Sequence, residues 1–225
     1  MGLTGGQDRA DTKLERAAHI LRSAIIQGDL EPGKKLNQQE LAESLGMSAT
    51  PIREVLRILE VEGLLTYEPY IGVSVARVSP ELALEITPIR MELEGLAVRL
   101  GVPNLDDESI AGLEAMLDEM ERARDELDFS RFRRINYQFH TTIYQASGSK
   151  ILCEMIERLW PRFATHVLQV IPGRDQQSMI QHQAIMEAIK QRDTDASARR
   201  MVEHIASAGQ AIVTFNSSQS VRSLQ

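Results

Sequence analysis

The chain has 225 residues, and a hydrophobic fraction of 43% is enough for the core of one large domain or of two small ones. Its single cysteine, Cys153, excludes a disulfide framework within the chain, and the lack of a signal-peptide core or of an apolar run of about 18 residues predicts a cytoplasmic protein that does not enter a membrane. The net charge is −7, and residues 1–78 contain nine Lys and Arg against eleven Asp and Glu. The overall charge therefore excludes nonspecific attraction of the chain to the phosphates of a nucleic acid.

Two helices separated by a break are predicted in the first part of the chain. Residues 1–10 are polar and glycine-rich, and we expect them to be disordered. An amphipathic helix over Leu14–Gln27 ends at residues 28–33, which contain two glycines and a proline. The next helix, Gln38–Leu45, ends at Gly46, which can adopt the left-handed conformation that terminates a helix.

A third helix and a hairpin are predicted to follow. Ser48 and Thr50 can cap a helix whose apolar positions recur at helical spacing from Ile52 to Leu59. Two short β-prone runs then flank a turn that contains Gly72. A glycine turn between two helices with a hairpin behind it is typical of a winged helix-turn-helix that reads the major groove of DNA, although the turn alone would also fit an ordinary helical hairpin.

The candidate DNA contacts lie before the second helix, at the start of the third helix and in the wing. Base or phosphate contacts are predicted for Gln39, Ser48, Thr50 and Arg53, and backbone contacts for Lys34, Lys35 and Gly72. Because these few cations stand in a slightly acidic segment, we expect binding that is specific, salt-sensitive and weak away from the operator.

The chain beyond the wing is predicted to be entirely helical. The fold class is therefore mainly α, with a winged helix-turn-helix over residues 11–77, an antiparallel helical bundle over residues 80–215 and a disordered tail over residues 216–225. Its helices are predicted at Pro80–Leu100, Asp106–Leu127, Phe129–Ser147, Lys150–Val170, Arg174–Arg192 and Thr194–Phe215. Pro88 is expected to kink or break the first of them.

Three histidines are predicted to point into the core of this bundle. His140, His182 and His204 lie on or beside the apolar stripes of three different helices, and Asn136 lies one turn before His140. A single inward histidine is usually a hydrogen-bonded core residue, because an unpaired buried polar group costs about 1–3 kcal/mol. Three imidazoles and one side-chain oxygen, however, suit a divalent ion such as Zn²⁺, Ni²⁺, Mn²⁺ or Fe²⁺.

Two further residues are candidate contacts to a small ligand. Arg90 has Glu94 one turn later, so it forms either an exposed ion pair or a cavity arginine that holds a carboxylate with two hydrogen bonds. His166 lies between Phe163 and Val167, so it either packs at the core or its rim or lines a cavity.

The sequence resembles the GntR family of transcription regulators, specifically the FadR subfamily with an FCD-type effector domain, from Thr12 to Phe215. The matching segments are GDLEPGKKLNQQELAESLGMSATPIREVLRILEVEGLL, IRMELEGLA, NYQFHTTIYQASGS, QHQAIMEAI with His182, and EHI with His204. The resemblance implies a homodimeric, metabolite-responsive regulator. It also implies a divalent metal held by Asn136, His140, His182 and His204, and an acidic effector near Arg90.

The sequence departs from the family pattern at three places. An amide stands at Asn136, where the family often has aspartate, which lowers the charge of the predicted metal site. Ala49 occupies the arginine position of the usual Ser-Arg-Thr-Pro motif, and Ile71 stands where the wing commonly has a basic residue. Because alanine cannot contact guanine as arginine does, the operator sequence cannot be transferred from relatives.

These observations favour a DNA-binding repressor that is not an enzyme. We expect a homodimer that binds double-stranded operator DNA and responds to a small carboxylate metabolite at the metal. Two alternatives remain open. The first is a metal-dependent hydrolase or lyase, although Asn136 cannot act as the general base. The second is an effector-independent DNA-binding protein with a structural metal.

Overall fold

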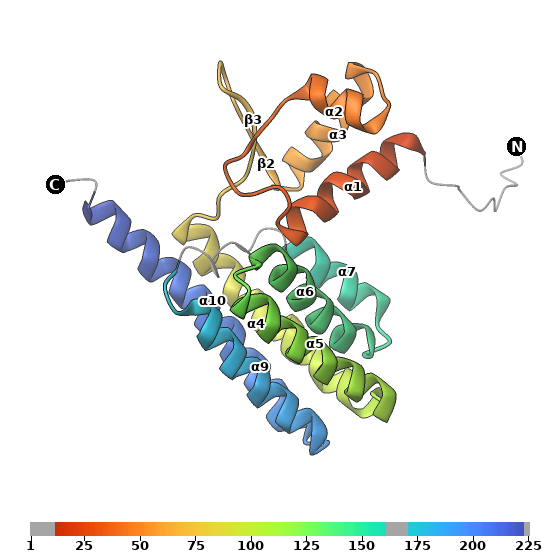
Figure 1. Ribbon diagram of the computed structural model, residues 1–225, viewed down its shortest axis with the longest axis vertical. Helices are drawn as coiled ribbons and strands as arrows, with labels where there is room; N and C mark the ends of the chain where they lie inside the picture. Colours follow the sequence, from red (N-terminus) through yellow and green to blue (C-terminus); the bar gives the residue numbers. More distant parts are fainter. Residues whose placement is uncertain (1–11, 161–170, 223–225) are drawn as a thin grey trace, which may run out of the picture. The chain divides into compact units, whose positions relative to one another are not determined.

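The computed structural model describes residues 12–160 and 171–222, and within the last helix it describes side chains as far as Phe215 (Figure 1). Contacts between residues divide the chain into two compact units. One contains the chain up to Ile25 together with Leu30–Ala76, and the other contains Ile26–Asp29 and the chain from Arg77 onward. Among the described residues, no helix is both long enough and apolar enough to span a membrane.

The first unit is a winged helix-turn-helix, as the sequence predicted. Its elements are α1 (Lys13–Gln27), β1 (Lys35–Leu36), α2 (Gln38–Leu45), α3 (Ala49–Val61), β2 (Leu65–Glu68) and β3 (Gly72–Val75). The antiparallel sheet has the order β1-β3-β2, with Leu36 opposite Val73 and Leu65 opposite Val75. Strand β1 was not predicted, because two residues carry no periodicity and become a strand only through pairing with β3.

The predicted turn residues end and begin the helices of this unit. Gly46 has φ 60°, in the left-handed region, and its N–H donates to carbonyls of α2. Asn37 caps α2, since its side-chain oxygen accepts from the backbone N–H of Gln39 at 2.9 Å. Ser48 is the residue before α3, but its hydroxyl makes no capping hydrogen bond. Gly72 has φ 101°, which closes the wing.

The described part of the second unit is helical except for its connections. It contains α4 (Pro80–Gly101), a short 3-10 helix (Val102–Asn104), α5 (Asp107–Asp125), α6 (Phe129–Gln145), α7 (Lys150–Leu159), α9 (Arg174–Lys190) and α10 (Thr194–Arg222). Helix α4 continues through Pro88, so of the kink or break that was expected there the break is excluded. One sequence prediction is wrong, because α10 continues beyond Phe215 to Arg222, into the tail that was expected to be disordered.

Small residues allow α4 to lie close to its neighbours. A Cβ atom on Gly95 would lie 2.9 Å from the Val202 side chain of α10, and one on Gly209 of α10 would overlap the side chain of Thr87. At the end of α4, a Cβ on Gly101 would overlap the backbone oxygen of Ile143 in α6. Close approach at these glycines fixes the spacing between the helices that carry the histidines and the helix beside them.

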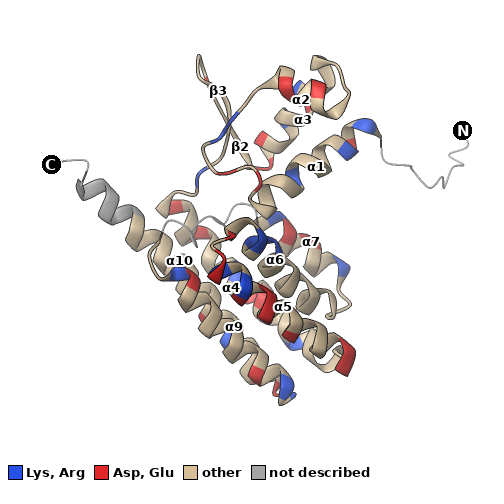
Figure 2. Cartoon of the chain, in the orientation of Figure 1, with Lys and Arg blue, Asp and Glu red and all other residues tan. Residues whose placement is uncertain are grey.

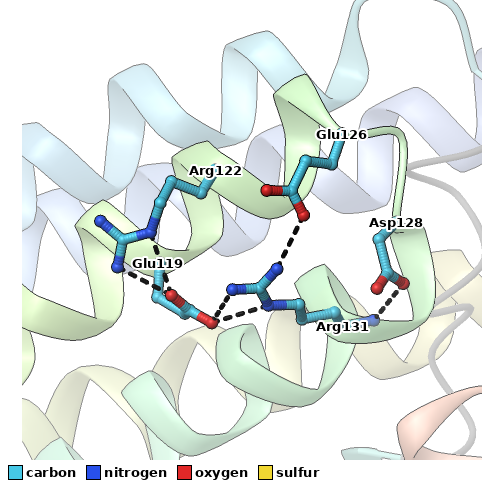
Figure 3. A network of polar contacts seen from close by, with 5 residues as sticks. All are labelled: Glu119, Arg122, Glu126, Asp128 and Arg131. Carbon is cyan, nitrogen blue, oxygen red and sulfur yellow. Dashed lines mark hydrogen bonds and ion pairs between the residues drawn. The ribbon is translucent and has the colours of Figure 1, made fainter.

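A polar network fixes the start of α6 against α5 (Figure 3). The Arg131 guanidinium donates to Glu119 at 2.6 Å and to Glu126 at 2.8 Å, and Glu119 also accepts from Arg122 at 2.7 Å. The Asp128 carboxylate caps α6 by accepting from the backbone N–H of Arg131 at 3.0 Å. These contacts set where α6 begins, and therefore which of its residues face the core.

Alanine at two helical glycines of the second unit should change stability in opposite directions. Gly101→Ala should lower the free energy of unfolding by about 1–3 kcal/mol, because the added methyl group meets backbone atoms that cannot turn aside. Gly112→Ala, in α5, should raise it by about 0.5–1 kcal/mol, because no atom lies within 4 Å of its Cβ. Urea unfolding of both variants measures the difference. Equal effects would contradict the close approach of α4 and α6.

Candidate metal centre and DNA-contacting surface

Three histidines from three helices meet inside the second unit. His140 comes from α6, His182 from α9 and His204 from α10, and their side chains are buried. One ring nitrogen from each lies within 4.8 Å of the other two. The Nε2 atoms of His140 and His182 are 3.1 Å apart, which is close to the spacing of two ligands on one first-row metal ion.

The three rings have the protonation state that a metal ion requires. Burial, followed by the positive charge of Arg174, lowers the pKa of His182 to about 3. Burial and the neighbouring histidines also lower the pKa of His140 and of His204 well below the usual value. The rings are therefore neutral at pH 7, and each neutral imidazole keeps one lone pair for coordination.

Hydrogen bonds determine which ring nitrogen of His140 and of His204 is free to bind a metal. The Tyr144 hydroxyl donates to a Glu94 oxygen, so it accepts from Nδ1 of His140 at 2.8 Å. The side-chain oxygen of Gln181 can only accept, and it lies 3.0 Å from Nδ1 of His204. Both rings therefore carry the proton on Nδ1 and leave the lone pair on Nε2 for a metal.

The residues present fit a divalent metal ion. Three neutral imidazoles whose ligand nitrogens lie within 4.8 Å of one another are a donor set that first-row divalent ions prefer. Asn136, the predicted fourth ligand, lies one turn before His140 on α6 and is half-buried. An ion held by nitrogen and amide oxygen would supply a Lewis acid in the core of the helical unit.

The Arg90–Glu94 pair lies beside this centre and is buried rather than exposed. The Arg90 Nε atom donates to Glu94 at 2.5 Å, and both side chains are at least nine-tenths buried. The guanidinium also lies 4.9 Å from the ring centroid of Trp160. Burial and the Glu94 carboxylate raise the pKa of Tyr144 well above its usual value, so Tyr144 remains a hydroxyl. His166, the other candidate ligand contact, lies outside the described residues.

Sequence reasoning missed the two residues that orient the histidines. Tyr144 follows His140 by four positions, so it lies on the same face of α6, and this spacing could have identified it. Gln181 is adjacent to His182 in sequence but supports His204, and nothing in the sequence predicts that pairing.

The candidate DNA contacts lie on the surface of the first unit. The side chains of Lys34, Lys35, Gln39, Ser48, Thr50 and Arg53 are exposed, while Gly72 is partly covered. Acidic residues accompany them on α2 and α3 (Figure 2). Attraction to phosphate would therefore depend on a few local cations and on backbone N–H groups, because the described residues of this unit form no broad basic face.

Comparison with known proteins identifies the family. The GntR family of bacterial regulatory proteins matches residues 13–75, and the FCD domain matches residues 85–207. The HTH-type transcriptional regulator McbR of Escherichia coli is 34% identical over 81% of this chain and 85% of its own. A solved structure of E. coli McbR/YncC has a TM-score of 0.78 and 31% identity, and covers 93% of this chain and 99% of that one. The chain belongs to the GntR family.

Membership of the GntR family decides between the broad alternatives. The HTH-type transcriptional repressor GlaR of E. coli is also 30% identical over 82% of this chain and 89% of its own. The matched families and these relatives are transcription regulators and not enzymes, so the chain is a DNA-binding transcription regulator. The hydrolase or lyase alternative loses its support.

Removal of the Tyr144 hydroxyl should weaken metal binding while the aromatic ring stays packed in the core. Tyr144→Phe takes away the acceptor for His140 Nδ1–H, so we expect Zn²⁺ affinity to fall about 10- to 100-fold. Tyr137→Phe on the same helix should bind Zn²⁺ as the wild type does. Competition with a chromophoric chelator measures both affinities. A Tyr144→Phe protein with wild-type affinity would contradict the proposed orientation of His140.

Proposed function

We propose that this GntR-family regulator is a homodimeric repressor whose operator binding responds to a small carboxylate at a metal centre. The ligands proposed for the metal are Asn136, His140, His182 and His204. The observation that carries the proposal is the convergence of three buried, neutral imidazoles from three separate helices. Repression is proposed as the sign of regulation because relatives such as GlaR and the gluconate operon transcriptional repressor of Bacillus licheniformis are named repressors.

In the proposed function, the first unit binds DNA and the second unit binds the metal and the effector. Exposed residues of α2, α3 and the wing contact the operator, and the repeated winged helix of a homodimer fits a nearly palindromic site. Tyr144 and Gln181 hold two histidines in the tautomer that binds a metal. Arg90 and His166 remain predicted contacts to the carboxylate. The carboxylate changes operator affinity only if it binds one arrangement of the dimer better than another.

Metal content tests the centre directly. Protein purified without a nickel column should contain about one metal ion per chain, because four protein ligands suffice for a tightly held first-row ion. His182→Gln should contain little metal, and treatment with a chelator should lower the melting temperature of the wild type but not of this variant. His19→Gln, at an exposed position of α1, is the matched control and should retain the metal. Absence of metal from the wild-type protein would contradict the four-ligand site.

Operator binding tests the function. An operator is first selected from a random DNA library with the wild-type protein, and its affinity is then measured by fluorescence anisotropy. Arg53→Gln should bind about 10- to 100-fold more weakly, because one side-chain contact to a base contributes about 1–3 kcal/mol. His182→Gln should bind the operator like the wild type, but its response to acetate, lactate, malonate or succinate should be weaker than that of the wild type.

Two outcomes of the operator experiment would contradict the proposal. Wild-type affinity in Arg53→Gln would remove Arg53 from the interface. Operator affinity that no carboxylate changes, together with loss of the fold on chelation, would favour an effector-independent regulator with a structural metal.

A further inference from the structure

Arg174 is a buried cation without a carboxylate partner in the described residues. It is the first residue of α9, and only 5% of its surface is exposed. Its Nη1 atom donates to the Ser207 hydroxyl at 3.1 Å and to the side-chain oxygen of Gln181 at 3.3 Å, and both acceptors are neutral. Residues 161–170, which precede α9 and lie outside the described residues, contain no Asp or Glu in their sequence.

Such an arrangement is unfavourable for the protein by itself. A guanidinium does not lose its proton in proteins, so burial leaves a full charge without water around it. Burial lowers the pKa of Arg174, and no neighbouring acid opposes the effect. Arg90, by contrast, is buried against the Glu94 carboxylate, so its charge is already compensated.

A hydrogen-bonded oxygen of Gln181 links Arg174 to the histidine cluster. The side-chain oxygen of Gln181 accepts from Arg174 Nη1 and also from Nδ1 of His204. The charge of Arg174 is close enough to lower the pKa of both His182 and His204. An anion that contacts the guanidinium therefore lies at the edge of the metal centre.

A second observation on the same helix indicates a ligand. His182 Nδ1 is fully buried and makes no hydrogen bond to any described residue, although most buried polar atoms in proteins are paired. An uncompensated cation and an unpaired imidazole nitrogen thus occur together on α9. Both would be satisfied by a small molecule that carries negative charge and polar atoms.

We propose that Arg174 binds the carboxylate group of the effector, and that it does so in preference to Arg90. This proposal rests on the proposed function, because it names the residue that recognises the anion at the same site. The ligand class is a small carboxylate, held at the guanidinium by charge-assisted hydrogen bonds. Arg90 attracts an anion less strongly, because Glu94 neutralises its charge.

The only tryptophan of the chain allows anion binding to be measured directly. The Trp160 ring lies 5.1 Å from the His140 ring, so its fluorescence should respond to a ligand in the centre. The full-length protein is loaded with Zn²⁺ and titrated with acetate, lactate, malonate and succinate, with acetamide as the neutral control. Arg174→Gln should bind these anions about 10- to 100-fold more weakly than the wild type.

Two further variants locate the effect. Arg200→Gln removes an exposed arginine of α10 that pairs with Glu203, and it should bind the anions as the wild type does. The double variant Arg90→Gln/Glu94→Gln removes both charges of the buried pair. When both variants are measured without Zn²⁺, so that the contact of Glu94 with Tyr144 does not affect the comparison, it should lose less affinity than Arg174→Gln. A larger loss in the double variant than in Arg174→Gln would overturn the proposal.

Thermal stability separates a binding role from a structural one. Without anion, Arg174→Gln should melt at the same temperature as the wild type or higher, because it removes an uncompensated buried charge. Malonate should raise the melting temperature of the wild type but not of Arg174→Gln, with or without Zn²⁺. A lower melting temperature with unchanged anion affinity would make Arg174 a structural residue and overturn the proposal.

Different results would reject the role of Arg174 and the metal centre. Wild-type anion affinity in Arg174→Gln overturns the role of Arg174 and leaves the metal centre intact if the Zn²⁺ content is about one per chain. Absence of Zn²⁺ from the wild type overturns the metal centre, while the malonate-dependent stabilisation still tests Arg174. If none of the four carboxylates binds the wild type, the anion site itself is rejected.

Discussion

The stability of the second unit depends on hydrogen bonds to the ring nitrogens of the histidines in its helical core. Each buried polar group without a partner costs about 1–3 kcal/mol, so three histidines in one core would destabilise it without specific partners. Tyr144 and Gln181 supply two of these partners, and Glu94 in turn accepts from Tyr144. The same hydrogen bonds that limit the energetic cost also decide which ring nitrogen faces the centre. Stability and the proposed metal binding therefore depend on the same contacts.

Helix α4 holds this set of contacts in place although it contributes no histidine. It carries Glu94, and it lies close to α10 because Gly95 and Gly209 have no side chains at the contact. The close approach also explains why Pro88 does not break the helix. A proline inside a helix removes one backbone hydrogen bond and its ring crowds the carbonyl of the preceding turn, and the buried packing of α4 against α10 offsets this cost.

Much of the fold and part of the site could be predicted from the sequence, because both follow from local periodicity. The apolar stripes located the helices and showed that His140, His182 and His204 face inward, which the structure confirms. Periodicity shows which face of a helix a residue occupies but not which residue it meets on another helix. Arg174 was therefore predicted only as the start of a helix, since its burial and its neutral partners depend on tertiary packing. The extension of α10 beyond Phe215 was missed because a polar composition predicted a disordered tail.

The uncompensated groups of α9 give a physical reason for ligand control. A ligand can shift a protein between states only to the extent that it stabilises one of them more than the other. A core in which every polar atom was paired would gain little from a small anion. Here Arg174 lacks a counter-charge and His182 Nδ1 lacks a partner in the part of the chain that the structure describes. In the proposed liganded state an anion would relieve the cost of these groups, and the free energy of that relief would be available to bias α9 and α10. This explains why a regulator would keep a destabilising arginine at a buried position, where a hydrophobic side chain would otherwise be more favourable.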